Sequence, residues 1–153
     1  MSRRQKAPCH PRSQTSIELA ATIQLVENAA AALNRHIGRF EIYGYLEAVY
    51  SVYVEWRRLK TAKRSARALA DELNVVRRKR ITPIRILIEA TLPRAHFKQK
   101  SRWVRALEYI YSRDVSPSDF SNFIRARGGL AGCARLAVGV SRKRRRPGGD
   151  WND

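Results

Sequence analysis

The chain has 153 residues, of which 44% are apolar, and its 31 lysines and arginines against 13 acids give a formal net charge of +18. This length fits one domain with a true hydrophobic core, and two cysteines are too few for a disulfide scaffold. The sequence lacks the run of about 20 apolar residues that predicts a transmembrane helix, and its basic start lacks the apolar stretch of a secretory signal. The large excess of cations favours a polyanionic partner.

The two ends of the chain differ in composition from the middle. Residues 1–14 and 141–153 are basic and poor in apolar side chains, so we expect a disordered basic arm and a disordered basic tail. Residues 15–140 are expected to form one helical domain, with a helical hairpin at 15–74 and a bundle of short helices at 81–140. The alternation typical of β-strands is missing, so the predicted fold class is all-α.

A first helix is predicted from Thr15, where Glu18 stands three residues later and completes a capping box. Gly38 is expected to end this helix. Apolar residues recur on one stripe at spacings of three and four, which is typical of a helix packed lengthwise against another. This seam must be buried within the chain or in a homodimer, and it consists of Leu19, Ile23, Val26, Ala30, Leu33 and Ile37.

A second helix is predicted from about Phe40 to about Asn74, and it is longer than the first. Its first half has a wide apolar face that suits two packing partners. Its second half has a narrow apolar stripe with cations on the opposite side. The overhanging end of the hairpin is therefore predicted to present a basic stripe made of Arg57, Lys60, Lys63, Arg64 and Arg67.

Charge is distributed unevenly along the chain. Between Arg57 and Arg105 there are sixteen basic and three acidic residues, a net charge of +13, whereas Thr15 to Trp56 carries −3. This asymmetry predicts one strongly positive region, and neutralising phosphates is what such a region does best. Besides the basic stripe, the candidate phosphate-binding residues are Arg77, Arg78, Lys79, Arg80 and Arg85, and Arg142, Lys143, Arg144, Arg145 and Arg146 in the tail.

Shorter helices are predicted in the rest of the chain. Thr82 before Pro83 caps one helix, residues 97 to 112 form the next, and Ser116 before Pro117 caps a third. Gly128 and Gly129 end the third helix, and Leu130 to Val138 forms the last one. The last three helices are spaced like a helix-turn-helix unit, with the final helix as the recognition helix. The small residues of that helix fit close packing against a neighbour equally well.

Catalytic and metal-binding patterns are sparse. His10, His36 and His96, with Cys9 and Cys133, show no metal-ligand spacing, and the carboxylates are scattered. The six tyrosines occur at helical spacings that indicate packing. We therefore expect no enzyme activity, no cofactor and no bound metal.

The function predicted from these patterns is non-catalytic binding of nucleic acid. Duplex DNA is the favoured partner, bound through its phosphates by a basic helix in an architectural role or in transcription regulation. The expected location is cytoplasmic, nucleoid-associated in a bacterium or nuclear in a eukaryote. Two alternatives stay open: an RNA-binding protein of a ribonucleoprotein, and an interaction or inhibitor protein that docks an acidic protein partner.

Overall fold

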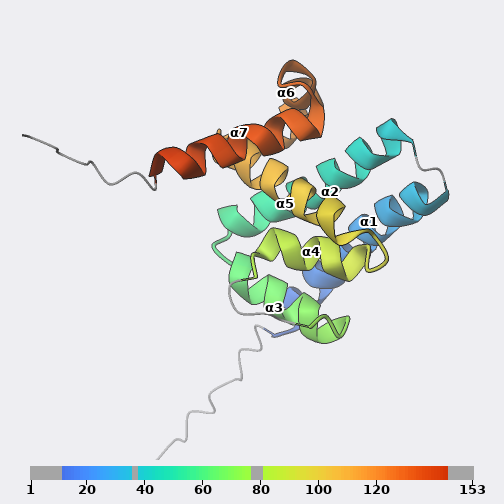
Figure 1. The fold of residues 1–153 in the computed structure, drawn as a ribbon. Helices are drawn as coiled ribbons and strands as arrows, with labels where there is room; N and C mark the ends of the chain where they lie inside the picture. The colour runs from blue at the N-terminus through green and yellow to red at the C-terminus, as the bar shows by residue number, and fades with distance from the viewer. Residues whose placement is uncertain (1–11, 36–37, 77–80, 145–153) are drawn as a thin grey trace, which may run out of the picture.

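The computed structural model describes residues 12–35, 38–76 and 81–144 (Figure 1). All of the regular secondary structure in these ranges is helical. The all-α prediction is confirmed for these ranges. None of their helices is long and apolar enough to cross a bilayer. The elements are α1 (Arg12–Arg35), α2 (Arg39–Arg58), α3 (Ala62–Glu72), α4 (Pro83–Thr91), α5 (Phe97–Tyr111), the short 3₁₀ helix η1 (Pro117–Asp119), α6 (Phe120–Ala126) and α7 (Gly129–Arg144).

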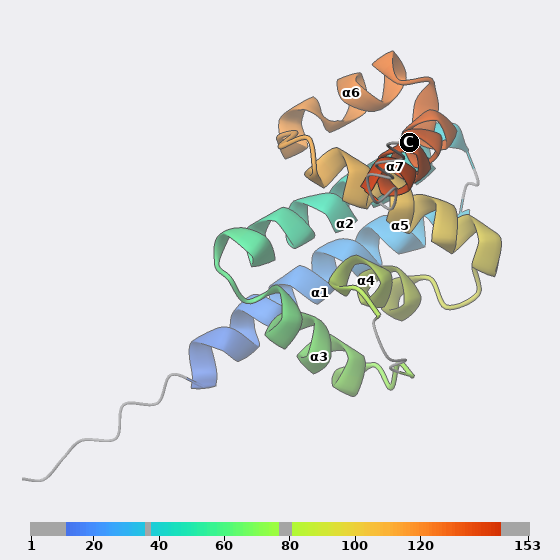
Figure 2. The same cartoon turned by 60° about the vertical axis from the view of Figure 1, so that its left-hand side comes forward.

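Helix α2 lies at the centre of the fold, because its apolar face is wide enough for several neighbours. It contacts α1, α3, α4, α5, η1 and α6. Figures 1 and 2 show α3 and α4 on one side of α2 and the α6–α7 pair on the other. The side chains that α2 buries are Tyr45, Leu46, Val49, Tyr50, Val52, Tyr53 and Trp56.

Helix α1 packs along α2 and uses the predicted seam to do so. Val26, Ala30 and Leu33 are buried in the common core, and Ile23 packs at its edge. These side chains are therefore covered by the chain itself, and the structure gives no support to a homodimer formed through them. The other two seam positions, Leu19 and Ile37, have side chains outside the described part of the structure.

Several predicted helix boundaries are reproduced, and others shift. The Thr82 hydroxyl accepts from the Arg85 amide (3.4 Å), and the Ser116 hydroxyl accepts from the Asp119 amide (3.3 Å), so both residues cap helices as expected. Helix α1 begins at Arg12, three residues before the predicted start. Helix α7 continues to Arg144, into the range predicted as a disordered tail.

Buried tyrosines supply much of the packing around α2. The Tyr50 hydroxyl donates to the Val115 carbonyl (2.6 Å), and the Tyr45 and Thr91 hydroxyls share a hydrogen bond of 2.7 Å. Burial raises the pKa of Tyr50 to about 12 and raises that of Tyr45 further. These phenols stay protonated and satisfied at neutral pH, so they act as core residues and not as nucleophiles.

Helix α7 docks closely because its first turns are built from small residues. Gly128 and Gly129 have φ angles of +76° and +79°, which glycine adopts without strain, and they reverse the chain between α6 and α7. A Cβ at Gly132 would meet the carbonyl oxygen of Arg127, so that position also requires glycine. Cys133 and Ala134 are buried, and α7 packs mainly along α5.

Candidate nucleic-acid interface

The predicted basic helix is interrupted in the middle, and the prediction of one continuous helix to Asn74 is wrong. The Thr61 amide donates to the Trp56 carbonyl (2.9 Å), and the Lys60 amide donates to the Arg57 carbonyl (3.1 Å). This pair of bonds is a Schellman cap, which needs a left-handed residue where Lys60 stands, with φ of +58°. The chain then turns and starts α3 at Ala62.

The break brings three predicted cations together. Arg57, at the end of α2, Lys60, in the turn, and Lys63, in the first turn of α3, line one hollow of about 440 Å³ with Ala62 and Tyr111. None of the residues lining this hollow is acidic. We call this site the α2–α3 corner. A pocket of this composition suits a phosphate group, which needs several cationic donors converging from different directions.

Tyr111 of α5 holds one of these cations in place. Arg57 donates from Nε to the Tyr111 hydroxyl (3.2 Å), and the guanidinium carbon lies 5.2 Å from the centre of the Tyr111 ring. Tyr111 in turn packs edge-on against Tyr53 of α2, with 5.0 Å between ring centres. The terminal nitrogens of Arg57 donate to no residue in the described ranges, so they remain able to bind an anion.

The rest of the predicted basic stripe lies on the exposed side of α3, next to the corner. Lys63, Arg64 and Arg67 are exposed at spacings of one, three and four, which places them on one side of the helix. The other side of α3 packs against α4 and buries Ala62, Ala66, Leu69 and Ala70. We call the exposed side the basic face of α3, and it is continuous with the corner through Lys63.

Arg85 does not belong to this surface. Its side chain is only 16% exposed, and its Nε donates to the Glu89 carboxylate at 2.7 Å. Its Nη1 donates to the Ser101 hydroxyl (2.9 Å), and its guanidinium lies over the Phe97 ring. The prediction that Arg85 extends the phosphate-binding surface is corrected on this point, because its charge is already neutralised inside the fold.

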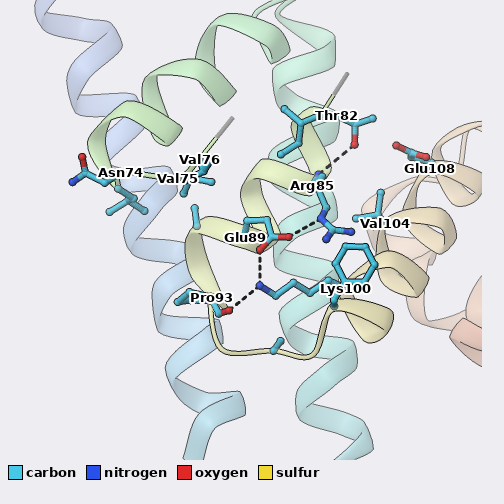
Figure 3. Close-up of a pocket in the computed structure, with 15 residues that line it drawn as sticks. Asn74, Val75, Val76, Thr82, Arg85, Glu89, Pro93, Lys100, Val104 and Glu108 are labelled. Atoms are coloured by element: carbon cyan, nitrogen blue, oxygen red, sulfur yellow. Dashed lines mark hydrogen bonds and ion pairs between the residues drawn. The ribbon is translucent and has the colours of Figure 1, made fainter. Parts of the chain in front are cut away.

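The carboxylate of Glu89 joins Arg85 to a buried lysine that sequence reasoning missed (Figure 3). Lys100 is almost fully buried, and its Nζ donates to Glu89 (2.6 Å) and to the Pro93 carbonyl (2.9 Å). Burial favours a higher pKa for Glu89, but the hydrogen bonds from Lys100 and Arg85 outweigh it and lower that pKa. The hollow of about 800 Å³ beside this network therefore contains a largely neutralised charge cluster.

The other predicted cations can be placed only in part. Residues 77–80 lie outside the described ranges, as do Arg145 and Arg146. Arg142, Lys143 and Arg144 form the last turn of α7, but their side chains are outside the described part. The four predicted cations in the range 77–80 are Arg77, Arg78, Lys79 and Arg80.

The helix-turn-helix hypothesis depends on what α7 presents to solvent. Gly132, Cys133 and Ala134 are buried, so that part of α7 serves packing. Among the exposed residues of the predicted recognition helix, Arg135 alone can donate several hydrogen bonds from its side chain. One such residue is too few to read several base edges, which favours the packing interpretation of this helix.

Metal ligands and a reactive cysteine thiol are two further features to consider in the described ranges. They contain no group of three or more His, Cys, Asp or Glu side chains arranged to hold a metal ion. Burial raises the pKa of the Cys133 thiol, which disfavours the reactive thiolate. Comparisons of the chain with protein-family models, curated proteins and solved structures find no match.

Proposed function

We propose that this protein binds duplex DNA without catalysis, through phosphate contacts made by the α2–α3 corner and the basic face of α3. The observation that carries the proposal is the convergence of Arg57, Lys60 and Lys63 on one hollow with no acidic residue in its lining. A solvated helix face normally mixes charges of both signs. Here the cations face one another across a turn, where their mutual repulsion is relieved when a phosphate binds between them.

The spacing of the cations suits contacts along the phosphate backbone of one DNA strand. Lys63 and Arg67 are one helical turn apart on the basic face of α3, about 6 Å along the axis, and the corner extends this row beyond the helix start. Successive phosphates of one DNA strand are separated by a comparable distance. Because phosphate contacts fix position but carry no sequence information, the role that follows is architectural or regulatory without base reading.

The test is the salt dependence of binding to a 25-base-pair duplex, followed by fluorescence anisotropy between 50 and 300 mM salt. Five phosphate contacts predict a log–log slope of about −4 to −5, at roughly 0.9 per neutralised phosphate. Replacing Lys63, Arg64 and Arg67 by Gln should flatten the slope by about 2 to 3.

The matched control removes the same charge elsewhere. Lys98, Arg105 and Arg135 are exposed on α5 and α7, and replacing these three by Gln should leave the slope nearly unchanged. Equal losses in the two triple variants would mean that the whole cationic surface acts and that the corner has no special role. A duplex RNA competitor that displaces the DNA at lower concentration would transfer the proposal to RNA.

A further inference from the structure

A groove lies at the other end of α2, away from the corner. It consists of two adjoining hollows, of about 570 and 790 Å³, which share Ile42, Gln99 and Trp103 in their linings. The first hollow reaches the turn between α4 and α5, and the second reaches the start of α7. Each of the two volumes is within the range of ordinary ligand sites.

The groove has apolar walls and a cationic rim. Its apolar residues come from four helices and from the turn after α4, and they include Leu33, Ile42, Leu92, Trp103 and Leu130. The charged residues that line it are all arginines, namely Arg94, Arg102 and Arg125, and each is exposed.

These arginines are not neutralised within the fold. No carboxylate lines either hollow, and no ion pair joins the three arginines to an acidic residue within the described ranges. This contrasts with Arg58 and Arg85, which are paired with Glu55 and Glu89. The rim is therefore complementary to a partner that carries negative charges on both sides of an apolar group.

We propose that this arginine-rimmed groove binds an acidic peptide segment of a partner protein. Carboxylates of the segment pair with Arg94 at one end and with Arg102 and Arg125 at the other, and an apolar side chain covers Ile42 between them. Arginine suits this role because its planar guanidinium binds a carboxylate through two parallel hydrogen bonds.

A nucleic-acid strand fits this groove less well. Trp103 is only 4% exposed, so its ring face is not open for the base stacking on which single-strand binding depends. The apolar walls also offer nothing to a phosphodiester. The groove is distinct from the corner, because Ile42 and Arg57 are fifteen residues apart on α2, or about 22 Å along the axis.

The experiment uses the full chain and a fluorescein-labelled 12-residue peptide, and binding is followed by fluorescence anisotropy at 150 mM salt. In the peptide, Asp and Leu residues follow one another in turn at the three- and four-residue spacings of one side of a helix. Saturable binding is expected. The double variant Arg102→Gln, Arg125→Gln should weaken it about tenfold, the combined effect of two partly exposed ion pairs. The matched variant Arg64→Gln, Arg67→Gln removes the same charge from α3 and should change the affinity less than twofold.

Two further measurements test the site itself. The indole N–H resonance of Trp103 should shift on peptide addition, while that of Trp56 stays in place. Matched peptides with Asn for Asp, or with Ser for Leu, should each bind more weakly, because one loses the ion pairs and the other loses the apolar contact.

The proposal would be overturned by absence of saturable binding, by equal losses in the two double variants, or by equal affinity for the matched peptides. It would also be overturned if a 12-nucleotide single strand bound more tightly than the peptide and lost affinity in the groove variant. Because both arginine pairs are exposed, circular dichroism and the melting temperature of each variant should match the wild type, so that loss of fold is separated from loss of binding.

Discussion

Lys60 occupies the left-handed position of the cap between α2 and α3, so replacing it by glycine tests the corner directly. The left-handed backbone costs a non-glycine residue about 1 kcal/mol, and glycine relieves this cost. Against that gain stands the larger conformational freedom that glycine gives the unfolded chain, about 0.5 kcal/mol. We therefore expect Lys60→Gly to stabilise the fold by about 0.5 kcal/mol, which raises the melting temperature by roughly 1–4 °C.

The sign of this change separates the structure from the continuous helix that the sequence pattern predicts. In the interior of a helix, the same substitution would cost about 1 kcal/mol. Thermal and urea unfolding followed by circular dichroism measure the difference, with Lys60→Gln as the control that removes the charge but keeps the Cβ. A Lys60→Gly protein less stable than Lys60→Gln by 1 kcal/mol or more would refute the break in the helix and the corner built on it.

The same pair of variants reports on binding. Both lose one cation from the α2–α3 corner, so both should flatten the salt dependence of DNA binding by about 0.9, although their stabilities differ. A slope that is unchanged in both would show that Lys60 contacts no phosphate.

Three further predictions concern the core and its charged groups. Val26→Asp places a carboxylate in the fully buried contact of α1 with the core and should cost about 3 kcal/mol or more, seen as loss of cooperative thermal unfolding. Lys100→Met leaves Glu89 with Arg85 alone and should cost about 2–3 kcal/mol at pH 7. The pKa of Glu89 is lowered in the fold. The difference in unfolding free energy between the wild type and Lys100→Met should therefore be largest above about pH 5, and it should shrink as the pH falls below the ordinary glutamate pKa of about 4.3. Glu108 is the opposite case: burial raises its pKa, against a hydrogen bond with Thr82, so ionised Glu108 destabilises the fold. Glu108→Gln should therefore raise the melting temperature at pH 7, and the advantage should vanish as Glu108 becomes protonated in acid; an advantage that persists below pH 4 would contradict this account.

Local signals predicted much of the fold. Thr82 before Pro83, Ser116 before Pro117 and the paired glycines at 128–129 each satisfy a requirement of the backbone at a helix end, so they can be recognised without tertiary information. The seam of α1 can also be predicted from the sequence, because the spacing of its apolar residues alone decides which side of the helix is buried. Whether a second copy or the same chain covers the seam depends on the position of α2, which spacing does not reveal.

The break in the helix at Lys60 cannot be predicted from such local signals. The apolar spacing continues from Trp56 through Ala62 to Ala66, and no glycine or proline marks the turn. The cap uses lysine at a position where glycine is usual, so the signal that would have indicated it is missing.

The candidate site combines residues that sequence could find with contacts that it could not. Charge clustering identified Arg57, Lys60 and Lys63, but Tyr111 is 54 positions beyond Arg57 and looked like an ordinary packing residue. Charge counting also treated Arg85 as an exposed cation, since only the packing of α4 against α5 brings Lys100 to Glu89. Clustered charges in a sequence indicate which region carries a strong electrostatic field. The fold then decides which of these charges are neutralised by ion pairs.

The length of α2 determines how the corner and the groove influence each other. About 22 Å of helix separates them, whereas the Debye length is roughly 8 Å at physiological ionic strength. An anion bound at one site is then screened from the other, so the two ligands would bind with nearly independent affinities in 150 mM salt. At 10 mM salt the Debye length grows to about 30 Å and exceeds the separation. Each bound anion would then weaken binding of the other, and by thermodynamic reciprocity the two penalties must be equal.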